Sequence, residues 1–112
     1  MQRDFEVYLD DISEACQRIE EYIAGFTYET FVRDDRTVDA VLRNLTVMGE
    51  AAKRVPDDMR NRFPGIDWKR VCGLRDVVVH QYPILELEVI WEIATNGVRE
   101  VRAILESRDS NG

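Results

Sequence analysis

Apolar side chains recur at steps of three and four residues through most of this 112-residue chain, and no other feature constrains the fold as strongly. The pattern runs from Arg3 to Phe26, from Thr37 to Val55 and from Leu85 to Ser107. This spacing gathers the apolar residues on one face of a helix, and that face must be buried against a neighbour. The sequence therefore predicts a protein built from packed helices.

Glycine, proline and aspartate indicate where these helices begin and end. Gly25 is expected to end the first helix, and Pro56 follows directly on the second. The segment Thr27–Arg36 has no sustained period, so we interpret it as a connection. Within it, either Asp34 or Asp35 could cap the helix that follows. The tail 108–112 is polar and is expected to fray.

A further helix is predicted between two prolines of the second half. Asp67 suits the N-cap of a helix that begins at Trp68. Pro83 disfavours the helical conformation of the residue before it, so this helix should end near His80 or Gln81. Residues 56–63 could form one short helix in addition. The expected fold is an all-α, up-and-down bundle of four main helices plus this short one, in a single domain of residues 1–112.

Charge and cysteine content narrow the functional classes. The chain has 22 acidic against 15 basic residues, a net charge of -7, which argues against non-specific nucleic-acid binding. Any RNA contact must be local, and the acidic surface also suits a basic protein partner. Cys16 and Cys72 lie in apolar patterns without a signal peptide, so we expect free buried thiols, a cytoplasmic protein and no zinc site. No apolar run is long enough for a membrane span.

One stretch combines the chain's single histidine with an arginine, an acid and a phenol. Histidine titrates near neutral pH, so His80 is suited both to accept and to donate a proton. Arg75 offers a rigid fork of donors for a phosphate. On a helix, Asp76 and His80 share a face, whereas Arg75 and His80 lie about 140° apart. The stretch reads Gly73-Leu74-Arg75-Asp76-Val77-Val78-Val79-His80-Gln81-Tyr82.

This Arg-x-x-x-x-His-x-Tyr string, preceded by Gly-Leu, resembles the signature of the HEPN superfamily and specifically of its HepT-like toxin branch. Further segments occur in the order seen in HepT-like proteins: Arg43-Asn44-Leu45, Gly49-Glu50-Ala51-Ala52, Phe63-Pro64, Asp67-Trp68 and Val89-Ile90-Trp91-Glu92. The resemblance implies a metal-independent ribonuclease without a cofactor. Arg75 and His80 would be catalytic, Asp76 and Glu50 would support them, and Glu50 would be a buried acid that braces the site.

The resemblance also implies a partner and a means of control. In that family the toxin is paired with a small MntA-type nucleotidyltransferase antitoxin, in a type VII-like toxin–antitoxin pair. The antitoxin transfers AMP from ATP onto the motif tyrosine, which here is Tyr82. The added charge and bulk beside Arg75 and His80 would repel RNA.

Cutting RNA without a metal requires a base, an acid and a cation for the crowded phosphate. One chain supplies one histidine, so a two-fold homodimer that joins two motifs would supply the missing proton carrier. Plainer readings exist: His80 could cap a helix C-terminus, Tyr82 could pack beside a turn, and Arg75 with Asp76 could be surface charge. The alternative function is a non-catalytic helical module that binds a nucleotidyltransferase or a nucleotide.

Overall fold

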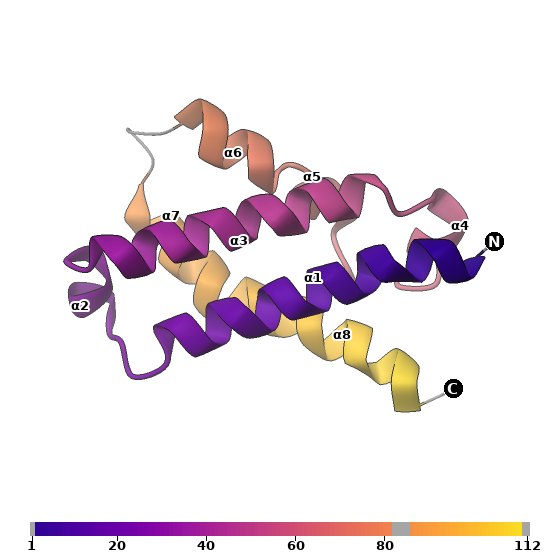
Figure 1. The fold of residues 1–112 in the computed structure, drawn as a ribbon, viewed down its shortest axis with the longest axis horizontal. Coiled ribbons are helices and arrows are strands. Elements are labelled where there is room, and N and C mark those ends of the chain that lie inside the picture. The colour runs from indigo at the N-terminus through magenta and orange to yellow at the C-terminus, as the bar shows by residue number, and fades with distance from the viewer. Residues whose placement is uncertain (1, 82–85, 111–112) are drawn as a thin grey trace.

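Two long helices, α1 (Gln2–Ile23) and α3 (Asp35–Lys53), pack against each other along the centre of the molecule (Figure 1). The computed structural model describes residues 2–81 and 86–110. Helix α6 (Leu74–Gln81) lies against α3, and α8 (Val98–Ser110) lies against α1, so Figure 1 shows them at opposite edges of this pair. Across those residues there are helices and no strand, which confirms the all-α bundle.

The predicted apolar stripes form one core between the helices. Burying a large aliphatic side chain contributes roughly 1.5–3 kcal/mol, so this shared core is the main source of stability. At the edge of the core, Arg102 of α8 pairs with Glu20 of α1 and with Glu106 of its own helix. The fully buried residues include Leu9, Ile12, Ile19, Phe31, Val41, Leu45, Met48, Ile90, Val98 and Leu105.

Several predicted helix ends are confirmed. Gly25 follows α1 with φ of +82°, a left-handed conformation that glycine adopts without strain. Asp34, rather than Asp35, caps α3 by accepting a hydrogen bond from the Thr37 N–H at 3.0 Å. Asp67 caps α5 (Trp68–Cys72) in the same way. Helix α4 (Asp57–Arg60) is the predicted short helix, over a shorter range than expected.

The prediction that Thr27–Arg36 is only a connection is wrong, because Tyr28–Val32 forms helix α2. The backbone N–H of Thr27 donates a hydrogen bond to the Thr30 hydroxyl at 2.9 Å, and the N–H of Thr30 donates one to the Thr27 hydroxyl at 3.2 Å. The buried ring of Phe31 then packs on Trp91, with ring centroids 5.0 Å apart. A five-residue helix is too short to show a period, so capping and one aromatic anchor stabilise it instead.

Two predicted helices are interrupted. The helix expected from Trp68 to about Gln81 is divided at Gly73 into α5 and α6, and α6 continues to Gln81, the last residue described before residue 86. The helix expected over Leu85–Ser107 is observed as α7 (Leu87–Glu92), a π-helical turn η1 (Ile93–Gly97) and α8. A π turn inserts one extra residue, which shifts the face that the following helix presents. Where the structure describes the chain, no helix has the length and apolar character to cross a membrane.

Candidate active site

Helix α6 carries the motif and begins in direct contact with α3. A Cβ atom added at Gly49 of α3 would lie 2.9 Å from the backbone nitrogen of Arg75 and 3.3 Å from the backbone oxygen of Val71. Backbone atoms cannot rotate away as a side chain can, so only glycine permits this approach. Gly49 therefore sets where the start of α6, and with it Arg75, lies on α3.

Arg75 lies between two carboxylates. Its Nε is 3.8 Å from Oε1 of Glu50, and its Nη1 is 3.6 Å from Oδ1 of Asp76. Both distances exceed that of a good hydrogen bond, so the N–H donors of Arg75 are not consumed by these partners. The two carboxylates orient the guanidinium by charge, and its N–H groups remain able to donate hydrogen bonds to another ligand.

The expectation of a buried acid at Glu50 is wrong, because 57% of its side chain is exposed. Position 50 lies on the side of α3 that faces solvent, next to the exposed Lys53. The acid is nevertheless in contact with Arg75, as the supporting role requires. At this exposure solvent screens the pair, so Glu50 orients Arg75 rather than adding much stability.

Lys53 belongs to the same group of charges, which the sequence did not reveal. Its Nζ lies 3.7 Å from Oδ2 of Asp76, and the side chain is 46% exposed. Lys53 follows Glu50 by three residues, so both project from one side of α3 toward the start of α6. The spacing of Glu50 and Lys53 was the sequence signal that could have pointed to Lys53. The contact with Asp76, however, depends on the packing of α6 against α3. Two cations and two carboxylates thus form one surface cluster: Glu50, Lys53, Arg75 and Asp76.

His80 lies in the last turn of α6 and is exposed. A helix rises about 1.5 Å per residue, so His80 stands about 7.5 Å along the axis from Arg75 and about 140° around it. No contact joins His80 to Arg75 or Asp76 within the described residues. Tyr82 lies outside the residues that the structure describes.

Neither cysteine belongs to this charged cluster. Cys16 is buried in the core, and burial raises the pKa of its thiol to about 12. Cys72 is a free, partly buried thiol at the end of α5, less buried than expected. Over residues 2–81 and 86–110, no three histidine, cysteine or acidic side chains are grouped so that they could hold a metal ion.

Comparison with known proteins identifies the family. The model of the family "Ribonuclease HepT-like" matches residues 12–108, which include α6 and the whole charged cluster. The chain belongs to the HepT-like family. This agrees with the resemblance read from Arg75, His80 and the segments around them.

Three curated relatives match this HepT-like chain over 84% or more of their own length. A protein of Thermococcus cleftensis, named as a probable ribonuclease HepT, is 33% identical over 95% of this chain and 96% of its own. A candidate RNase of Methanocaldococcus jannaschii is 35% identical over 97% of this chain and 96% of its own. A candidate RNase of Caldanaerobacter subterraneus is 32% identical over 84% of both chains. No solved structure gives a significant match.

Proposed function

We propose that this HepT-like protein is a toxin ribonuclease that cuts RNA without a metal ion. The observation that carries the proposal is the placement of Arg75, held on α3 by Gly49 and Glu50, one and a half turns before the exposed His80 on the same short helix. Family membership and the ribonuclease names of the relatives support it.

The chemistry assigns each group one role. A base removes the proton of an RNA 2′-hydroxyl, the 2′-oxygen attacks the adjacent phosphorus, and the 5′-oxygen leaves with a proton from an acid. His80 is the proton carrier, and Arg75 neutralises the crowded phosphate. Glu50 and Asp76 hold Arg75 in place, and Lys53 offsets the charge of Asp76.

A homodimer would complete this site. One His80 cannot be base and acid at the same moment, and on one helix Arg75 and His80 diverge by about 140°. In a two-fold dimer, the partner subunit could place its copy of this histidine across the cleft from Arg75. The two histidines would then supply the base and the acid at the same time. Next to His80, Val79 is 49% exposed, and Val89 on α7 is 42% exposed. The exposed Val79 within the motif helix is consistent with a surface that a partner covers.

Control by a partner follows from the same site. We infer that an MntA-like nucleotidyltransferase transfers AMP from ATP to the Tyr82 oxygen, forming an O–P bond and releasing pyrophosphate. The new phosphate would compete with RNA for Arg75, and its negative charge would repel the RNA. Mass spectrometry after incubation with the antitoxin and ATP should find AMP on the Tyr82 peptide and loss of RNase activity. Inhibition of the Tyr82→Phe protein by a catalytically inactive antitoxin would refute this control mechanism.

The central experiment measures RNA cleavage by wild type, His80→Ala and Arg75→Ala. Each variant should lose about 10²- to 10⁴-fold in rate, the usual cost of removing such a group. Arg36→Ala is the matched control, because it removes an exposed arginine from the far end of α3. Circular dichroism should show unchanged helicity in all three. Cleavage should persist in EDTA, and loss of activity that a divalent ion restores would reject the metal-independent mechanism.

Sedimentation at tens of micromolar protein should show a dimer. A monomer would exclude a mechanism with two His80 side chains. The outcome that supports the other candidate function, a non-catalytic binding module, is a folded wild-type protein that cleaves no RNA yet binds the nucleotidyltransferase.

A further inference from the structure

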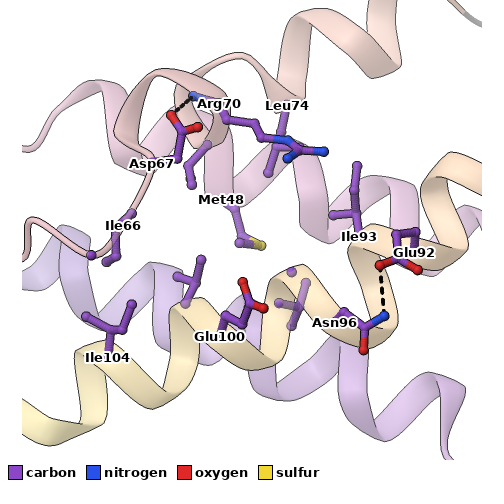
Figure 2. A pocket seen from close by; sticks show the side chains of 15 residues that line it. Met48, Ile66, Asp67, Arg70, Leu74, Glu92, Ile93, Asn96, Glu100 and Ile104 are labelled. Atoms are coloured by element: carbon purple, nitrogen blue, oxygen red, sulfur yellow. Dashed lines mark hydrogen bonds between the residues drawn. The ribbon is translucent and has the colours of Figure 1, made fainter.

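A pocket of about 350 Å³ opens on the side of α5 and α6 that faces η1 and α8 (Figure 2). Its apolar wall comes from α3, α5, α6 and α8 and consists of buried side chains, among them Met48, Val71, Leu74 and Val98. Small-molecule sites span roughly 300–1,000 Å³, so this pocket accepts a flat ring and is too small for a helix of a partner protein.

Four charged side chains line the pocket, and two of them have no partner in the part of the chain that the structure describes. Asp67 caps α5 through the Arg70 N–H, and Glu92 accepts a hydrogen bond from Asn96 at 2.9 Å. Both Arg70 and Glu100 are exposed, and no hydrogen bond or ion pair joins either side chain to another of the described residues. Figure 2 shows Arg70 along the α5 side of the pocket, running past Leu74, and Glu100 on the α8 side, with Met48 between the two in this view. The pocket thus offers a fork of donors on one side and a pair of acceptors on the other.

We propose that this pocket binds a guanine base of the RNA, an inference that rests on the proposed ribonuclease function. Guanine presents two acceptors, O6 and N7, on one edge, which match an arginine. Its N1–H and N2–H₂ donors lie on another edge and match the two oxygens of a carboxylate. Cytosine and adenine offer a single amino donor group, and uracil a single ring N–H. The apolar wall accommodates the ring faces.

The pocket is connected to the candidate active site through α6. Leu74 forms part of its wall and directly precedes Arg75, and Cα atoms of adjacent residues are about 3.8 Å apart. Arg70 lies one turn earlier, on α5. Adjacent side chains on a helix diverge by about 100°, so Arg75 leaves α6 on a different side from Leu74, and in our proposal the sugar–phosphate backbone of the RNA spans this turn from the pocket to Arg75. Single-stranded RNA, whose bases can turn outward, is the form that fits this arrangement.

Binding of mononucleotides tests the pocket without any cleavage. Titration of the ¹⁵N-labelled protein with GMP should shift the amide signals of pocket residues and give an affinity at least tenfold above that for AMP, CMP or UMP. Glu100→Gln should lower the GMP affinity at least tenfold. Glu21→Gln, which removes an exposed acid from α1, should leave it unchanged. Equal affinity of all four nucleotides, or no effect of Glu100→Gln, would overturn the inference.

Cleavage of short RNAs that differ in one base separates the two proposals. The wild type should cut beside guanine at least tenfold faster than beside the other bases. Arg70→Gln should abolish this preference while still cutting all four RNAs, and Lys69→Gln is its exposed neighbouring control. GMP binding without RNA cleavage would reject the ribonuclease and keep the pocket. If the base preference of cleavage is unchanged when Arg70 or Glu100 is substituted, the guanine pocket is refuted while the proposed ribonuclease function stands. If the pocket variants weaken only association with the nucleotidyltransferase, the pocket is a protein contact and the inference fails.

Discussion

Replacing Gly49 with alanine should separate α6 from α3 and damage the site without touching a charged group. The new Cβ would lie 2.9 Å from the Arg75 nitrogen and 3.3 Å from the Val71 oxygen. Alanine gains up to about 1 kcal/mol in a helix relative to glycine. Overpacking against a core costs about 1–3 kcal/mol, and here the obstacle is backbone. The clash should win, with a net loss of about 1–2 kcal/mol.

Urea unfolding followed by circular dichroism measures this loss, and RNA cleavage measures its effect on the site. A displacement of Arg75 of about 1 Å lowers the rate by up to about 10²-fold. Gly73→Ala is the matched control, because its Cβ would meet only the Lys69 and Arg70 oxygens at 3.5 and 3.6 Å. That variant should be at least as stable as wild type. If Gly49→Ala is equally stable and active, the close approach does not position α6.

Four further predictions concern the scaffold. Because its pKa is raised to about 12, Cys16 should resist alkylation at pH 8 in the folded protein, as measured by mass spectrometry, and react once urea exposes it. The raised value also means that the folded state holds this proton more tightly, so stability should fall as the pH rises from about 9 toward 12. Trp68→Phe removes the indole N–H donated to the Arg60 and Phe63 carbonyls and should cost about 1–3 kcal/mol in urea unfolding. Gly25→Ala forces a Cβ onto φ of +82° and should cost about 1 kcal/mol, seen as a lower melting temperature; an unchanged value would contradict the left-handed helix end.

The sequence by itself determined the helical architecture and most helix ends. The steps of three and four apolar residues define one buried stripe for each long helix, and this stripe needs no knowledge of its partner. Asp34 and Asp67 cap helices through hydrogen bonds to residues only three positions away. Gly25 acts through its own backbone conformation. These are local interactions, which is why local sequence predicts them. The roles of Arg75 and His80 came from a family resemblance rather than from spacing.

Tertiary structure alone decided how the charged groups are arranged. Asp76 meets Lys53 because α6 crosses α3 at Gly49, and Glu50 is exposed because that face of α3 remains open to solvent. The π turn before α8 also depends on packing, because that segment carries an ordinary helical pattern. Gly73, the C-cap of α5, was by contrast a local signal for the division of the motif helix. The pocket joins residues 70 and 100, which lie on different helices. Contacts between distant segments depend on crossing points and helix rotation, and no local pattern encodes those.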